Sequence, residues 1–275
     1  MLGGRLVSLI IGLIGGVFGG LVGFGGGVIM IPLMVDFLKM TQHRAHGTSL
    51  VAVVFTGLAG AVTYFQNGSV DLTAAGILAT AAIFTTRIGA RFAHALPEWK
   101  LKRSFGAFLL FVSAMMLAKP YLPHLESFFP SQEARAVILP ASGTLAGFAS
   151  GMMGVGGGTI MVPAMVLCLG FTQHAANGTS LAAMVVAGSV GAWTHFRLNN
   201  VQTGHLIGLV PGVIGGGIIG GMAANHMPEA YLRVLFSAVL IWPGIRNLKA
   251  NPPRKTAFVA GNTPHGQAID TERSC

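Results

Sequence analysis

The sequence predicts an all-α polytopic membrane protein of two related halves, each a glycine-broken helical hairpin followed by three transmembrane helices. Only 9% of the residues are Asp, Glu, Lys or Arg and 52% are hydrophobic, whereas about a quarter of the residues in a soluble domain are charged. The segment Gly23-Phe-Gly-Gly-Gly-Val-Ile-Met-Ile-Pro32 also returns, 131 residues later, as Gly154-Val-Gly-Gly-Gly-Thr-Ile-Met-Val-Pro163. A duplicated apolar chain with glycine breaks is typical of secondary transporters.

The apolar segments divide the chain into two repeats. We expect the first repeat over 1–118, an external connecting loop over 119–135, the second repeat over 136–248 and a disordered cytoplasmic tail over 249–275. A helix needs about 17–25 mainly apolar residues to cross the hydrocarbon. Segments of that length lie at 47–65, 72–90, 178–196, 204–224 and 230–248, and shorter ones at 104–118 and 136–153.

Glycines recur at every fourth position in the first segment of each repeat. They are Gly12, Gly16 and Gly20 in the first repeat and Gly143, Gly147 and Gly151 in the second. Membrane helices use such stripes to approach one another closely, so we expect packing faces here.

The distribution of basic residues predicts that the second repeat is inverted relative to the first. If each broken segment forms a hairpin whose two ends lie on one side, the three crossings that follow reverse the second repeat. With the N-terminus inside, thirteen basic residues lie on the inner side: Arg5, Lys39, Arg44, Arg87, Arg91, Lys100, Lys102, Arg103, Arg197, Arg246, Lys249, Arg254 and Lys255. Only Lys119, Arg135 and Arg233 lie outside near the spans. The positive-inside rule favours this topology over four complete spans per repeat, and it accounts for the net charge without a nucleic-acid partner.

The two glycine runs, 23–27 and 154–158, form the predicted centre of the site. Non-helical backbone at membrane depth must be buried in protein or line a wet cavity. Glycine permits sharp turns with open N–H groups, and the short helix after each run (28–38 or 159–169) directs its positive dipole end to the same point. We therefore expect an anion site at Gly25, Gly26, Gly27, Gly156, Gly157 and Gly158. The alternative is that these glycines only permit tight helix crossing.

Two polar segments that recur after the glycine runs supply the other candidate substrate-binding residues. These are Gln42, His43, Thr48, Ser49, Gln173, His174, Asn177, Thr179 and Ser180. The hydroxyls could cap a helix or donate to a ligand, and the histidines could orient the segment or carry a coupling proton. Asn177 stands where the first repeat has His46, so the two half-sites cannot be chemically identical.

Nothing in the sequence indicates a metal, a cofactor or a catalytic group. Cys168 and Cys275 have no plausible disulfide partner and no metal-ligand spacing. The glycine runs lack the lysine of a phosphate loop, and Val28 stands where a dinucleotide fingerprint needs Gly or Ala. Asp36 in the first short helix is matched by Leu167, so the buried carboxylate relay of a cation pump is missing. This favours an anionic or neutral substrate.

The doubled G-x-G-G-G-x-x-x-x-P, followed by T-Q-H-x-A-x-G-T-S-L, resembles the sulfite exporter TauE/SafE family over about residues 5–248. The resemblance implies a secondary carrier, mostly in the bacterial inner membrane, for small sulfur-containing anions such as sulfite, sulfonates or sulfoacetate. It carries the family's motif onto the two glycine runs, onto Pro32 and Pro163, and onto the two G-T-S segments.

We therefore expect a transporter, not an enzyme, that moves a small anion through the lipid bilayer by alternating access, with a proton or a sodium ion as the coupling ion. An anion channel of the same architecture is the alternative. An intramembrane serine hydrolase that uses Ser49 or Ser180 is disfavoured, because both serines occupy duplicated, helix-capping positions without an identifiable base and carboxylate.

Overall fold

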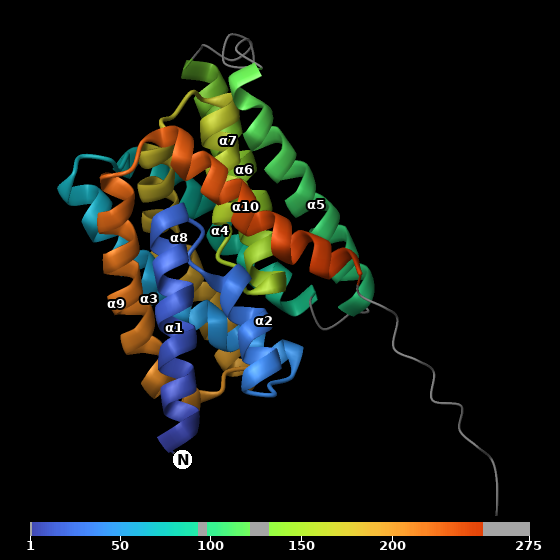
Figure 1. Cartoon of the computed structure of the whole chain (residues 1–275). Coiled ribbons are helices and arrows are strands. Elements are labelled where there is room, and N and C mark those ends of the chain that lie inside the picture. The colour runs from blue at the N-terminus through green and yellow to red at the C-terminus, as the bar shows by residue number, and fades with distance from the viewer. Residues whose placement is uncertain (1, 93–97, 122–131, 250–275) are drawn as a thin grey trace, which may run out of the picture.

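The computed structural model describes residues 2–92, 98–121 and 132–249, which form helices joined by short turns (Figure 1). The helices are α1 (Leu2–Val22), α2 (Gly27–Phe37), α3 (Gln42–Gln66), α4 (Leu72–Phe92), α5 (Glu98–Ala118), the 3₁₀ turn η1 (Lys119–Tyr121), α6 (Gln132–Met153), α7 (Gly158–Cys168), α8 (Gln173–Arg197), α9 (Thr203–Asn225) and α10 (Glu229–Leu248). Almost all of the expected tail, and residues 122–131 of the expected connecting loop, lie outside the described residues.

Six of the helices are long and apolar enough to cross a membrane, namely α1, α3, α4, α6, α8 and α9. One expected boundary and one expected span differ from the structure. α6 begins at Gln132, inside the expected loop, because its polar first turn continues the helix beyond the apolar segment. α10, which we expected to span the membrane over 230–248, is not among the six, because Arg233 and Arg246 lower the hydropathy of its 20 residues. It is still about 30 Å long at 1.5 Å per residue.

The helices pair across the two halves of the chain. α1 packs along α9 and α6 packs along α4, while α3 packs along α8 and α5 along α10. Exchanging α1–α5 with their counterparts α6–α10 reproduces the same set of pairs. Figure 1 shows α1 and α9 side by side, with α2 folding back after α1. The chain halves are therefore interleaved, and neither is a separate body.

Contacts along α1 and α9 show that these two helices run in the same direction. Gly12 lies against Leu209, and two turns later Gly20 lies against Gly217. A Cβ atom at Gly16, between them, would lie 2.6 Å from the carbonyl oxygen of Val213. The equivalent stripe of α6 approaches α4 in the same way, so both expected glycine stripes are confirmed as packing faces.

α3 and α8 run in opposite directions. Gly47, near the start of α3, lies against Asn200, which follows the end of α8. Gly178, near the start of α8, lies against Ser69, which follows the end of α3. Since Asn200 also precedes α9, which begins beside α1, the starts of α1, α3 and α9 lie at one end of the molecule. We call it the α1 end, and the opposite end, where α4 begins, the α4 end.

Two neighbouring glycines of α9 test this packing. A Cβ atom at Gly216 would lie 2.7 Å from the amide nitrogen of Val17, whereas one at Gly215 would have nothing within 4 Å. We expect Gly216→Ala to lower the free energy of unfolding by about 1–3 kcal/mol through overpacking. Gly215→Ala should leave it unchanged or raise it by up to about 1 kcal/mol through helix propensity. Thermal unfolding of the purified variants in detergent measures both, and equal shifts would contradict the close contact of α1 with α9.

Candidate functional site

The first four residues of each glycine run form a short non-helical break between two helices. Gly25 and Gly26 have φ angles of 76° and 80°, and their counterparts Gly156 and Gly157 have 91° and 82°. Glycine adopts these left-handed angles without the steric cost that a Cβ atom brings. α2 and α7 begin at the residue that follows each break, one position before the expected start of each short helix.

The two breaks meet in the centre of the molecule. Gly27 lies against the carbonyl oxygen of Gly154, and Gly158 lies against that of Gly23. Every residue of both runs is buried. In this arrangement the breaks pack against each other, which is the tight-crossing role that we gave as the alternative to direct anion binding.

Ser49 and Ser180 connect the breaks to the opposite repeat. Ser49 Oγ donates to the carbonyl oxygen of Gly154 at 2.9 Å, and Ser180 Oγ donates to that of Gly23 at 2.7 Å. Each hydroxyl also lies within hydrogen-bond distance of the carbonyl three residues earlier in its own helix. Each repeat thus satisfies a carbonyl in the other repeat's break, where the surroundings exclude water.

Thr48 and Thr179 act as caps between the repeats. Thr48 Oγ1 accepts a hydrogen bond from the amide of Gln202 at 3.0 Å, just before α9. Thr179 Oγ1 accepts one from the amide of Asp71 at 3.0 Å, just before α4. Both threonines therefore satisfy a backbone N–H at the start of a helix, which has no partner within that helix.

Beside the first break, Asn177 is completely buried, and its side-chain amide makes hydrogen bonds within the protein. Its oxygen accepts from Gln173 Nε2 at 3.1 Å. Its nitrogen donates to the carbonyl oxygen of Leu21 at 3.2 Å and approaches the hydroxyl of Tyr64 at 3.4 Å. This half-site is closed within the protein.

Beside the second break, His46 replaces that asparagine. Its ring lies beside the backbone of Met152, and the residue is 8% exposed. His195, the counterpart of Tyr64, lies nearby with Nε2 2.9 Å from the carbonyl oxygen of Gly151. His46 Nε2 itself has no hydrogen-bond partner among the described residues.

A cavity of about 240 Å³ reaches the second break at the α1 end. Residues of α2, α3, α5, α6, the second break and α10 line it: Val28, Ile31, Pro32, Val35, Gln42, His46, Lys102, Met153, Val155, Pro243, Arg246 and Asn247. None of these lining residues is acidic. Arg246 is paired through both guanidinium Nη atoms with Asp36 at the end of α2, at 2.9 Å each. The lining is therefore apolar with a few basic and amide groups, which suits a small anion.

The predicted site residues do not all gather at this cavity. Gln42 lines it, whereas its counterpart Gln173 is 1% exposed. His174 Nε2 lies 3.0 Å from the carbonyl oxygen of Ala224 and 3.1 Å from that of Met227, so it holds the end of α9. His43 is not among the residues that line the cavity.

Sequence reasoning missed His46 and Lys102 as site residues. A signal for Lys102 was present, because Arg233 follows it by the same 131 residues that separate the glycine runs. A basic residue therefore stands at the matched position of α5 and of α10. In the described part of the chain, no cluster of three His, Cys, Asp or Glu residues could hold a metal ion.

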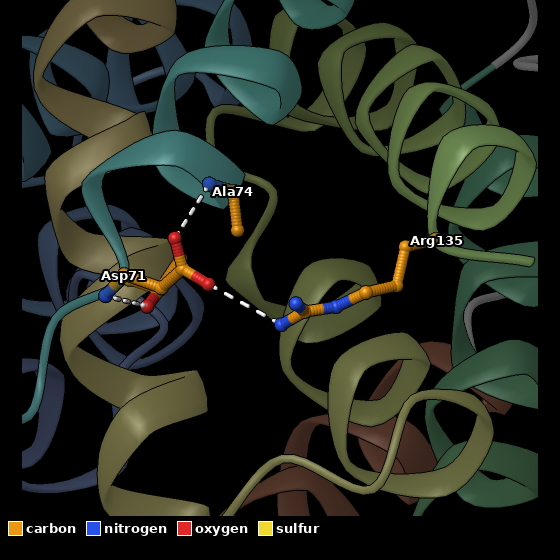
Figure 2. Close-up of polar contacts among 4 residues, drawn as sticks. Asp71, Ala74 and Arg135 are labelled. Atoms are coloured by element: carbon orange, nitrogen blue, oxygen red, sulfur yellow. Dashed lines mark hydrogen bonds and ion pairs between the residues drawn. The ribbon is translucent and has the colours of Figure 1, made fainter. Parts of the chain in front are cut away.

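Polar contacts around Asp71 join three segments at the α4 end (Figure 2). Its Oδ1 accepts from the amide of Ala74 at 2.9 Å, which caps α4, and its Oδ2 lies 3.3 Å from Nη2 of Arg135 in α6. The Arg135 guanidinium also lies 5.0 Å from the ring centroid of Phe171, between α7 and α8. The ends of α4, α6 and α7 that lie at the α4 end of the molecule are thus tied together.

Comparison with known proteins gives the family of the chain. The model of the family described as Sulfite exporter TauE/SafE matches residues 8–247. The chain belongs to the sulfite exporter TauE/SafE family. One relative, named "Probable membrane transporter protein YunE" of Bacillus subtilis, is 27% identical over 262 residues, which cover 87% of this chain and 95% of YunE. Another, a "Probable membrane transporter protein" of Xylella fastidiosa, is 28% identical over 249 residues, which cover 87% of this chain and 91% of that protein. No solved structure matches the chain.

Membership of the TauE/SafE family makes this chain a multi-pass membrane transporter and not an enzyme. The geometry agrees with this, because both candidate nucleophiles, Ser49 and Ser180, hydrogen-bond to backbone carbonyls. An activated serine would instead need a general base within hydrogen-bond reach.

Variants at Asp71 and Arg135 of this TauE/SafE protein should distinguish the contribution of the helix cap to stability from that of the ion pair. Asp71→Ala removes both and should lower the free energy of unfolding by about 0.5–2 kcal/mol. Arg135→Gln removes only the pair, whose side chains are 51% and 32% exposed, and should cost at most about 1 kcal/mol. Asp71→Asn keeps an oxygen for the cap and should behave like Arg135→Gln. Unfolding in detergent ranks the three, and a greater loss in Arg135→Gln than in Asp71→Ala would refute this division.

Proposed function

We propose that this TauE/SafE protein is a secondary transporter that moves a small sulfur-containing anion across the bacterial inner membrane by alternating access. The observation that carries the proposal is the cavity at the α1 end, whose described lining includes His46, Lys102 and Arg246 and no carboxylate. Arg246 is already paired with Asp36, so the charge of Lys102 is the feature of this lining that attracts anions. A volume of about 240 Å³ has room for an ion of the size of sulfite, a short sulfonate or sulfoacetate.

We infer that the two repeats are inverted, related by a pseudo-twofold axis in the membrane plane. The matched helices α3 and α8 run in opposite directions, as this relation requires. The reciprocal bonds of Ser49 to Gly154 and of Ser180 to Gly23 support it too, because each is the image of the other under exchange of the repeats. Four complete spans per repeat would give parallel repeats, in which matched helices run the same way. Inverted repeats around a site of broken helices are common among secondary transporters.

The transport cycle follows from the different exposure of the two half-sites. Val35 and Gln42 line the cavity at the α1 end, whereas their counterparts Val166 and Gln173 are 0% and 1% exposed. The excess of basic residues at the α1 end supports its placement on the cytoplasmic side. A rocking of one repeat against the other would exchange these exposures. The anion would then meet the glycine tips and the polar segments of both repeats as the breaks separate.

Uptake into liposomes tests the transport activity. Purified protein should take up at least one of sulfite, sulfoacetate and methanesulfonate, with saturation and counterflow. Gly25→Ala should reduce this uptake at least tenfold with folded protein recovered, because its φ is 76° and a Cβ atom would lie 2.8 Å from Cγ1 of Val53 at the centre. Gly76→Ala is the control, since a Cβ atom there meets nothing within 4 Å.

Two outcomes of this assay would contradict the proposal. Flux that rises linearly with concentration, without counterflow, would indicate an anion channel of the same architecture. Absence of uptake for every anion tested would refute the substrate class.

Side-specific labelling tests the topology. In a background without Cys168 and Cys275, cysteines at Gln66, at the end of α3, and at Lys249, after α10, should react with an impermeant maleimide from opposite sides of the membrane. Both positions are exposed in the structure. Labelling of both from one side would exclude the inverted arrangement.

A further inference from the structure

His46 is a buried polar side chain that lines the cavity and lacks one partner. The residue is 8% exposed, and its Nε2 atom has no hydrogen-bond partner among the described residues. Since Nε2 has no partner, we assign the contact of the ring with the Met152 backbone to Nδ1. A buried nitrogen left without a partner costs free energy that a bound group can recover. Because the residue lines the cavity, a ligand bound there would supply the missing partner.

The tautomer restricts the kind of ligand. With Nδ1 assigned as the donor to the Met152 backbone, a neutral His46 ring presents a lone pair at Nε2. The oxygens of a fully deprotonated oxyanion are also acceptors, so the two cannot bond directly. One proton has to lie between them, carried either by the ring or by the anion.

The cavity supplies the other groups that an oxyanion needs. Gln42 lies one helical turn before His46, on the same face of α3, and offers amide hydrogens. Lys102 of α5 lines the same cavity and offers a positive charge. Hydrogen bonds to ionised groups are the strong ones, so Lys102 should contribute most of the affinity.

We propose that Lys102, Gln42 and His46 form an oxyanion-binding half-site at the α1 end, in which one proton is shared between His46 Nε2 and the bound anion. The inference rests on the proposed transport function and names the residues that first receive the anion. The proton is not consumed, because it joins the site with the anion and leaves it with the anion.

The matched half-site at the α4 end has no such requirement. It consists of Arg233, Gln173 and Asn177, at the positions that match Lys102, Gln42 and His46. An asparagine amide donates hydrogen bonds without binding an extra proton. In the observed arrangement Gln173 and Asn177 bond to each other at 3.1 Å, so this half-site is not available. Proton and anion binding are therefore linked only on the His46 side.

Other ionisable groups lie near the His46 ring and must be separated from it by controls. They are His43 on α3, Lys102 on α5, His195 on α8, and Arg246 on α10 with its partner Asp36 on α2. A variant at position 46 leaves all of them in place, so a change in pH dependence belongs to His46.

Anion binding to the full-length protein in detergent tests the contribution of the Lys102 charge to affinity. Calorimetry with sulfite and with methanesulfonate should show at least a tenfold weaker affinity in Lys102→Gln than in the wild type. Arg103→Gln is the matched control, because it removes the next positive charge of α5 at an exposed position outside the cavity lining, and it should change the affinity by no more than about twofold. Equal effects of the two variants would overturn the half-site.

The pH dependence tests the shared proton. Methanesulfonate carries no proton between pH 6 and 8.5 (roughly the range in which His titrates), so its binding requires a protonated ring. Wild-type affinity should be greatest at low pH and should fall as pH rises, by up to about tenfold per unit. His46→Asn, which copies position 177, should bind with nearly constant affinity, and His46→Gln serves if that variant does not fold.

Two negative results would refute different parts of the proposal. A wild-type protein that binds neither anion refutes the proposed function, and with it the half-site. Wild-type binding with the same pH profile in His46→Asn refutes the shared proton while leaving the transporter intact.

Discussion

The structure depends on the satisfaction of backbone polar groups where two helices are interrupted inside the protein. A break in a membrane helix leaves carbonyl and amide groups without their helical partners, and lipid offers no replacement. Here Ser49 and Ser180 supply donors to the carbonyls of Gly154 and Gly23, across the interface between the repeats. In each break, a backbone carbonyl accepts its hydrogen bond from a serine of the other repeat. The interleaved packing of the two halves follows, because each half completes the other.

This reciprocity also explains how one sequence difference produces an asymmetric site. Position 46 and its counterpart 177 stand beside the break of the opposite repeat, so the residue there both packs against the break and borders the proposed substrate path. Asn177 has enough donors and acceptors to bond with Leu21 and Gln173 at once. His46 lines the cavity, and its Nε2 atom has no hydrogen-bond partner among the described residues. A conformational cycle that exposes these positions in turn therefore presents different chemistry to the two sides.

Much of this architecture could be predicted because duplication makes local signals visible twice. The short helices were expected at 28–38 and 159–169, and they occupy Gly27–Phe37 and Gly158–Cys168. The four-residue glycine stripes identified packing faces because close helix approach requires small residues at that spacing. Helix boundaries in polar sequence were harder to predict, as α6 shows, because hydropathy identifies only the apolar part of a helix.

The candidate site was predicted only in part, since its contacts are long-range. The partner of Ser49 lies 105 residues away along the chain. The sequence therefore identified the hydroxyl as a hydrogen-bonding group, but it could not show whether the hydroxyl bonds to a ligand or to a backbone carbonyl. The cavity depends on how α5 and α10 pack beside α2, which periodicity does not encode. That is why Lys102 escaped notice although its match with Arg233 was visible.

Alternating exposure of the two half-sites is the central claim, and the matched positions Val35 and Val166 measure it most directly. Val35 lines the cavity, whereas Val166 is fully buried. In proteoliposomes that lack the native cysteines, a cysteine at each position would be probed with an impermeant thiol reagent from each side, with and without a transported anion. We expect Val35→Cys to react from the cytoplasmic side. Val166→Cys should react only from the opposite side, and mainly during turnover. Reaction of both from one side, or a Val166→Cys that stays unreactive while transport proceeds, would contradict this claim.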